Sequence, residues 1–159
     1  MATFWEFYHT TFRPTGLTTT VGGAITSAQL AGDLNELFAY VDGPPSGSET
    51  AEYQYRKIHV KNASTVQLTG VRAWIDAVEH SEQIAIGIES GNASTSTNGT
   101  TAPTDPSIEF LQPNAYSTGL NIDTLPASQS TGIWIRQTLS GIDEPDPYAT
   151  LRVNVGGIK

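Results

Sequence analysis

Apolar and polar residues alternate strictly in three neighbouring segments between residues 57 and 89. The apolar positions of these segments are Ile58, Val60, Val71, Ala73, Ile75, Ile84, Ile86 and Ile88. Strict alternation is typical of a β-strand that buries one face and exposes the other. Because short polar links join the three segments, the pattern predicts an antiparallel meander in which each strand pairs with the next.

The second half of the chain continues this pattern after a long polar segment. Residues 90–107 are rich in Ser, Thr, Asn, Gly and Pro, which predicts an exposed loop. Further strands are expected at 108–110, 120–125, 133–136 and 151–155. Six or seven short strands over about 100 residues predict an all-β fold, an antiparallel β-sandwich of the immunoglobulin-like or jelly-roll type.

The sandwich domain is assigned to residues 52–159, and residues 1–51 are assigned to an extended N-terminal arm, a short helix at about 27–41 and a linker. Five apolar residues recur at helical spacing in this region: Leu30, Leu34, Leu37, Phe38 and Val41. Gly and Pro in residues 42–51 end the helix. We expect its apolar stripe to cover an open end or edge of the sandwich, the alternative being that the stripe binds a partner.

Aromatic residues crowd into the beginning of the chain. They are Phe4, Trp5, Phe7, Tyr8 and Phe12. A fully exposed cluster of rings promotes aggregation, so these side chains are expected to be buried somewhere. They form either an edge strand on the protein's own sandwich or an arm that docks on a neighbouring subunit. Since aromatic residues dominate many interfaces, we take these five as candidate partner-binding residues.

The charge balance narrows the classes of partner. The chain has 16 acidic and 8 basic residues, and its formal net charge is −8 at pH 7. This balance disfavours binding to nucleic acid or to an anionic membrane surface. Apolar runs stay well below the roughly 20 residues of a membrane span, and the first residues do not resemble a signal peptide. Together with the absence of cysteine, these features predict a soluble protein made in the cytoplasm, without disulfides or thiolate metal sites.

Candidate chemistry is sparse. His9, His59 and His80 are not at a short metal-ligand spacing, and His59 is expected on the solvent-facing side of its strand. The sequence lacks a Gly-x-Ser-x-Gly elbow, a P-loop and a His-Glu-x-x-His motif. The acidic segment 143–147 is expected to be a solvated loop, with a structural cation as the alternative. We therefore expect neither an enzyme nor a cofactor or metal site.

Trp74 and Trp134 lie on the strand faces opposite the apolar positions. If these rings were exposed they would offer a flat platform on which a sugar could stack. The preferred alternative is that they are buried in the core or at an interface with another subunit.

The strand motifs resemble those of small tailed-phage virion proteins. Residues 52–62, EYQYRKIHVKN, resemble the family's EYR-x-x-x-VKN strand. Residues 71–76 (VRAWID) and 84–88 (IAIGI) resemble its following strands, and residues 34–38 (LNELF) match a segment that precedes the domain.

A second set of matches lies nearer the C-terminus. Residues 120–127 (LNIDTLPA) and 132–136 (GIWIR) resemble the family's GLSLGDIPAG…VWIRR stretch. Ser128 stands where the family pattern has glycine. The resemblance covers roughly residues 30–155, with the motifs in the same order.

The resemblance implies a non-enzymatic structural component of a virus particle. The role that we predict is capsid decoration, in which the protein binds the outer shell and bridges neighbouring capsid subunits. Its partners would be the major capsid protein, other virion proteins and further copies of itself, and its location would be the virion. The alternatives are a tail, neck or fibre component, and a carbohydrate-binding module for host attachment.

Overall fold

β-strands dominate the computed structural model, which describes residues 4–15, 19–30, 53–79, 83–90, 93–138 and 148–155. In chain order the elements are β1 (Trp5–Phe12), β2 (Thr20–Gln29), β3 (Tyr53–Asn62), β4 (Leu68–Glu79), β5 (Ile84–Glu89), β6 (Ser96–Asn98), the 3-10 turn η2 (Tyr116–Thr118), β7 (Leu120–Leu125), β8 (Ser130–Thr138) and β9 (Tyr148–Val155). The predicted strands at 120–125, 133–136 and 151–155 lie within β7, β8 and β9.

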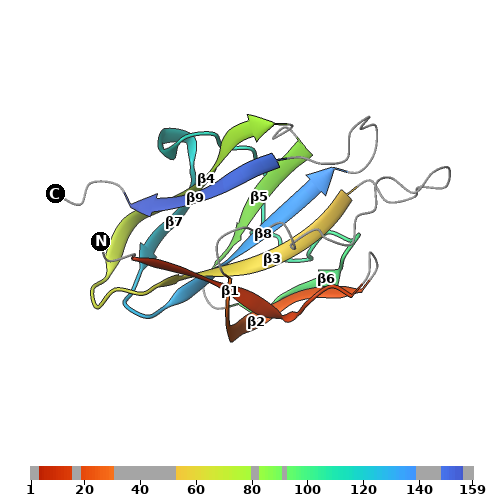
Figure 1. Cartoon of the computed structure of the whole chain (residues 1–159), viewed down its shortest axis with the longest axis horizontal. Helices are drawn as coiled ribbons and strands as arrows, with labels where there is room; N and C mark the ends of the chain where they lie inside the picture. The colour runs from red at the N-terminus through yellow and green to blue at the C-terminus, as the bar shows by residue number, and fades with distance from the viewer. Residues whose placement is uncertain are drawn as a thin grey trace.

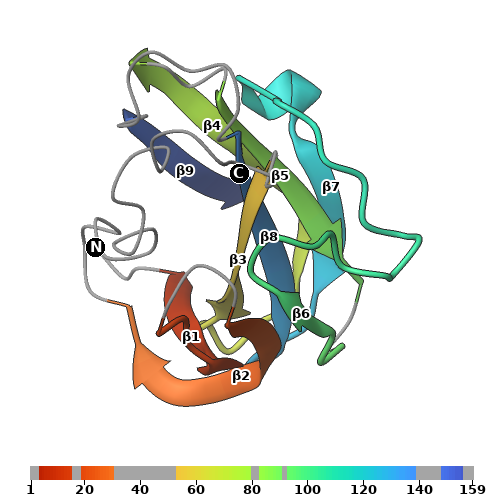
Figure 2. The same ribbon diagram turned by 90° about the vertical axis from the view of Figure 1, so that its right-hand side faces the viewer.

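These strands form two antiparallel sheets. The larger sheet has the order β5-β8-β3-β1-β2-β6, and the smaller has the order β7-β4-β9. Figure 1 shows the smaller sheet packed against one side of the larger one. Figure 2 shows the β1-β2-β6 end of the larger sheet curving round, so that this sheet resembles part of a barrel. The predicted all-β antiparallel sandwich is therefore confirmed.

The main core lies between the two sheets and consists of aliphatic residues at alternating positions. Its buried members are Ile58, Val60, Ala73, Ile75, Ile84, Ile86, Ile133 and Ile135. Removing a side chain the size of isoleucine from water contributes about 1.5–3 kcal/mol. The alternation in the sequence thus identifies correctly the side of each strand that faces this core.

A second core covers the opposite face of β3 and β8. Its buried members and the half-buried residues packed on them are Val21, Tyr55, Trp134, Tyr53, Ile108 and Phe110. The Gly23 amide donates a hydrogen bond to the Thr95 carbonyl at 2.9 Å. The Tyr55 amide donates to the Gly99 carbonyl at 2.7 Å. The segment containing β6 thereby covers this face through its backbone, while most of its described residues are exposed, as predicted for residues 90–107.

The predicted meander is wrong. β3 pairs with β1 and β8, β5 pairs with β8, and β4 belongs to the other sheet. The three segments of the predicted meander, which lie in β3, β4 and β5, therefore do not pair with one another. Alternation fixes which face of a strand is buried, but it carries no information on which strand becomes its neighbour.

The N-terminal region also differs from the prediction. β1 lies between β3 and β2, so residues 5–12 belong to the larger sheet and do not form an extended arm. Of the alternatives for the aromatic residues, the structure shows a strand on the protein's own sandwich. Residues 27–29 lie in β2, which corrects the start of the predicted helix. The rest of that helix and the linker, residues 31–51, lie outside the described residues, as does the acidic segment 143–147.

Residues 108–110 were expected to form a strand and do not. Leu111 makes one isolated bridge with Ile86, in which each amide donates to the other residue's carbonyl at 2.9 and 3.0 Å. Ile108 and Phe110 instead use their side chains to cover the second core.

Candidate functional site

Four of the five predicted partner-binding residues lie in β1, and Phe4 directly precedes it. Trp5 and Phe7 are half-buried and pack against the main core. Trp5 also packs against the small cluster of Leu68, Val71 and Leu125. These two rings stabilise the sandwich, and their contact surface is largely used within the protein itself.

Tyr8 lies with Glu6 on the other face of β1. The Tyr8 hydroxyl donates a hydrogen bond to Glu6 Oε2 at 2.7 Å. Lys61 of β3, which pairs with Glu6 across the sheet, places Nζ 5.6 Å from the centroid of the Tyr8 ring. The hydrogen bond to the Glu6 carboxylate raises the pKa of Tyr8 above its ordinary value. Glu6, Tyr8 and Lys61 thus form a half-buried polar cluster that contains one aromatic ring.

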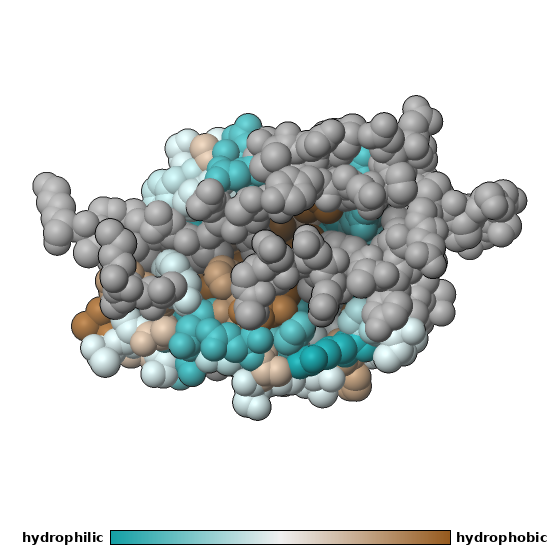
Figure 3. Space-filling model, in the orientation of Figure 1, coloured by the Kyte–Doolittle hydropathy of each residue, from teal (hydrophilic) through white to brown (hydrophobic). Residues whose placement is uncertain are grey.

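Phe4 provides the exposed apolar surface at the beginning of β1. Its side chain is 42% exposed, and its carbonyl accepts a hydrogen bond from the Ala63 amide at 2.8 Å. That bond places Phe4 beside the loop between β3 and β4, where Val66 is 57% exposed. We call these two residues the Phe4/Val66 end. Figure 3 shows hydrophobic surface at this end of the molecule.

Phe12 is exposed at the opposite end of β1. Its side chain is 44% exposed, and a Cβ atom placed on Gly23 would lie 2.9 Å from its ring. Eight residues separate Phe12 from Phe4, a span of roughly 26 Å at about 3.3 Å per residue. The five aromatic residues therefore do not form one patch, and sequence reasoning missed Val66 because a valine in a short polar turn gives no signal.

The tryptophan side chains are not arranged as a sugar platform. Trp134 is 0% exposed and belongs to the second core. Trp74 is half-buried, with its ring edge-on to Tyr116 at a centroid distance of 5.8 Å. Burial of Trp134 agrees with the core alternative and removes one of the two rings on which the carbohydrate-binding prediction rested.

A buried ion pair lies on the outer face of β3, where the alternation predicted solvent. Lys57 and Glu89 of β5 form a salt bridge in which both side chains are 0% exposed. Trp134 Nε1 donates to Glu89 Oε2 at 3.0 Å, and the Thr95 amide donates to Glu89 Oε1 at 3.1 Å. Lys57 Nζ also donates to the carbonyls of Gly23 and Ala93, at 2.9 and 3.1 Å.

Burial and these contacts together set the pKa values of both partners. Burial pushes the pKa of Glu89 upward, but the hydrogen bonds from Lys57, Thr95 and Trp134 outweigh it, so the pKa lies below its ordinary value. Burial lowers the pKa of Lys57, and the charge of Glu89 opposes that shift. The pair is thus a structural element that joins β3, β5, β8 and the covering segment.

His59 corrects the expectation of a surface histidine. It is 1% exposed, and Nε2 lies 3.3 Å from the Gly23 carbonyl oxygen. Asn62, at the end of β3, is also fully buried. The side-chain nitrogen Nδ2 of Asn62 donates hydrogen bonds to the carbonyls of Val66 and Leu125 at 2.8 and 2.9 Å. His59 and Asn62 therefore have structural contacts that alternation could not reveal.

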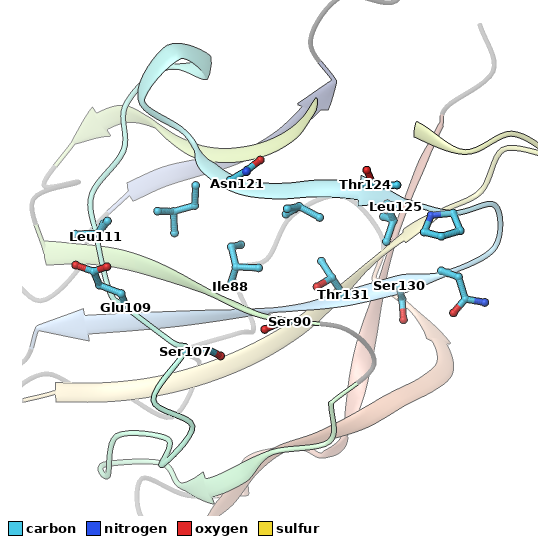
Figure 4. A pocket seen from close by; sticks show the side chains of 14 residues that line it. Ile88, Ser90, Ser107, Glu109, Leu111, Asn121, Thr124, Leu125, Ser130 and Thr131 are labelled. Atoms are coloured by element: carbon cyan, nitrogen blue, oxygen red, sulfur yellow. The ribbon is translucent and has the colours of Figure 1, made fainter. Parts of the chain in front are cut away.

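A groove of about 450 Å³ opens between β7 and the β5–β8 edge of the larger sheet. Figure 4 shows Ile88 and Thr131 projecting toward β7, while Asn121 and Thr124 point outward. Glu109 is the one ionisable group among the lining residues. The groove therefore offers hydroxyl and apolar surface but no acid–base pair within the part of the chain that the structure describes.

Two searches of the described residues concern other classes of site. They contain no group of three or more His, Cys, Asp or Glu side chains placed to hold a metal ion. Within the same residues, no helix is long and apolar enough to cross a membrane. No protein-family model matches the chain, and neither curated proteins nor solved structures give a match.

Proposed function

We propose that the protein is a non-enzymatic structural component of a tailed-phage particle. Its preferred role is that of a capsid decoration protein, which binds the outer shell and bridges neighbouring capsid subunits. It would be made in the host cytoplasm and reside on the virion, in many copies related by the symmetry of the shell.

The observation that carries this proposal concerns two residues with left-handed backbone. Asp123 and Ser128 have φ values of 66° and 62°, and they are the non-glycine residues with positive φ in the described part of the chain. Such a conformation favours glycine, because a Cβ atom costs about 1–2 kcal/mol there. When residues 120–128 are aligned with LSLGDIPAG, both positions fall on a glycine of the family pattern. The backbone geometry thus supports the alignment independently of the strand motifs.

The strand motifs also coincide with the buried centre of the fold. The stretch that resembles EYR-x-x-x-VKN contains all of β3, and residues 132–136 lie at the centre of β8. These two strands pair over nine consecutive positions, and each is buried on both faces. A resemblance that includes these buried strands supports a shared fold more strongly than it supports a shared attachment mode.

For attachment, the Phe4/Val66 end is the surface that we favour. It presents an aromatic and an aliphatic side chain that are 42% and 57% exposed, next to the half-buried Tyr8–Glu6 cluster. A modest contact of this kind is sufficient on a symmetric shell, since repeated copies raise the effective affinity without further contacts.

Immunogold labelling of purified particles tests the proposed location. The particles would be exposed to an antibody against the recombinant protein and imaged by negative-stain electron microscopy. Label distributed over the whole head supports decoration. Label confined to the neck or tail contradicts decoration and favours the tail or fibre alternative, and intact particles without label contradict a surface virion protein.

A further inference from the structure

One carbonyl oxygen on β2 is held by two basic side chains of β3. The Gly23 carbonyl accepts a hydrogen bond from Lys57 Nζ at 2.9 Å and lies 3.3 Å from His59 Nε2. Both side chains lie on the outer face of β3, and each is at most 3% exposed. Because a carbonyl can only accept, the neutral His59 ring must carry its hydrogen on Nε2.

The groups around His59 disfavour a positive charge on its ring, because Lys57 is already charged beside it. Glu89 is the anion of the site, and Lys57, Trp134 and Thr95 already bind it. Across the sheet His59 pairs with Gly132 of β8 and Tyr8 of β1, neither of which carries a charge at neutral pH. The other charged groups on this face are Glu6 and Lys61, which interact with Tyr8 at the edge of the site. Arg136 of β8 stacks on Tyr53 and Phe110, and the charge of Asp105 acts on Lys57.

The second ring nitrogen of His59, Nδ1, lacks an acceptor for a proton within the described part of the chain. Nδ1 is buried and has no hydrogen-bond partner among the described residues. A proton added there would create a buried donor without an acceptor, next to the ammonium group of Lys57. Both effects favour water entering the site, and water can enter only if the segment that covers it moves away.

We propose that His59 is an acid-sensitive latch. When it is neutral it binds the Gly23 carbonyl and holds β2 and β6 over the second core. When it is protonated the repulsion from Lys57 releases this cover and exposes Trp134 and Tyr55 to solvent. This proposal goes beyond the proposed function and does not rest on it.

The direction of the pH effect follows from the burial. Burial, reinforced by the charge of Lys57, lowers the pKa of His59, although the Gly23 hydrogen bond and Glu89 oppose the shift. The unfolded chain therefore binds this proton near pH 6.5 while the folded protein does not. Stability is full above about pH 6.5 and falls as the pH decreases, with the unfolding equilibrium constant rising up to about tenfold per pH unit.

Urea unfolding at pH 7 and pH 5 tests the latch in the full chain. The unfolding constant of the wild type is expected to rise more than that of His59→Gln, by up to roughly 25-fold, because the Gln amide donates to Gly23 without titrating. His9→Gln, a change on the neighbouring strand, is the matched control and is expected to keep the wild-type dependence. Equal pH dependence in the wild type and His59→Gln would overturn the proposal.

A second measurement on the wild type avoids any reliance on a variant that folds poorly. Native-state hydrogen exchange at pH 7 and pH 5 reports the amides of Gly23 and Tyr55, which bind the cover, and of Ile86, which binds Leu111 elsewhere. After correction for intrinsic rates, protection at Gly23 and Tyr55 is expected to fall at least fivefold more than at Ile86. A uniform fall, or unchanged protection at all three amides, contradicts a local latch.

Discussion

Lys57 and Glu89 form an ion pair that is fully removed from solvent, and the carboxylate also accepts hydrogen bonds from Trp134 and the Thr95 amide. The pair connects the middle of the larger sheet to the segment that covers its outer face. A charge left alone in such a site is far more costly than the pair itself.

Removing the cation alone is therefore expected to be severe. Lys57→Met leaves the Glu89 carboxylate buried without a counter-charge, and we expect a loss of about 3–5 kcal/mol in the free energy of unfolding. The double variant Lys57→Met/Glu89→Gln keeps an acceptor for Trp134 but removes the charge, so it should recover part of that loss. Urea unfolding of the set measures this, and a loss below about 1 kcal/mol for Lys57→Met would contradict the account.

The depressed pKa of Glu89 predicts a separate loss of stability in acid. A carboxylate whose pKa is lowered on folding stabilises the protein above its ordinary value of 4.5, and this contribution is lost as the pH falls through the folded pKa. Between pH 5 and pH 3 the wild type should lose stability more steeply than Glu89→Gln. Parallel curves of unfolding free energy against pH for the two proteins would contradict this assignment.

Gly22 is required where β2 crosses Trp134. Its φ is 92°, and a Cβ atom would lie 2.7 Å from both the Trp134 ring and the Thr95 carbonyl oxygen. We expect Gly22→Ala to cost about 2–4 kcal/mol, from backbone strain and overpacking together. Gly119→Ala is the control, since its φ is −58° and its nearest neighbours lie at 3.1 Å. Thermal unfolding that ranks the two variants equally would count against this reading of the cover.

Ser128 and Ala127 offer a matched test of the turn before β8. Ser128→Gly relieves a left-handed serine, which offsets the greater chain entropy of glycine, so its stability should be within about 0.5 kcal/mol of the wild type or higher. Ala127→Gly has no such relief and should lose about 0.5–1 kcal/mol. If differential scanning calorimetry shows an equal loss in both variants, the glycine positions of the family pattern have no geometric basis in this chain.

The Phe4/Val66 end is expected to matter for binding and not for folding. The double variant Phe4→Ser/Val66→Ser should weaken binding to particles at least tenfold, because exposed apolar anchors carry much of an interface. Its unfolding free energy should stay within about 0.5 kcal/mol of the wild type. Leu111→Ser, another exposed hydrophobic site at 43% exposure, is the control, and co-sedimentation with particles measures binding. Equal binding by both variants would remove this end as the attachment site.

How far the sequence predicts the structure depends on the kind of information required. Ile58, Ile86 and Ile133 alternate with their neighbours, and that period of two was sufficient to place them in a core and to predict an antiparallel sandwich. The sequence did not predict the strand order, because β3 pairs with Trp5 to Tyr8 and with residues 130–138, which are far from it in the chain.

The prediction that the polar face of β3 is exposed to solvent is wrong for a physical reason. Lys57 and His59 look like solvent-facing residues, and only the distant segment around Thr95 and Gly99 buries them. The buried Lys57 is tolerated because it forms an ion pair with Glu89 of β5. The local sequence pattern of neither strand indicates this pairing. Partner binding by the five aromatic residues stays a prediction: Phe4 and Phe12 are exposed and available for contact, whereas Trp5 and Phe7 pack against the main core.

We propose that this protein is a structural component of the virion shell, and its copy number in purified particles is the decisive measurement. Quantitative mass spectrometry with isotope-labelled peptides would give the ratio of this protein to the major shell protein. A decoration protein is expected at a ratio of order one, because it is repeated over a symmetric shell. A ratio far below one would contradict decoration and favour the neck or tail, and absence from the particle would contradict the structural role altogether.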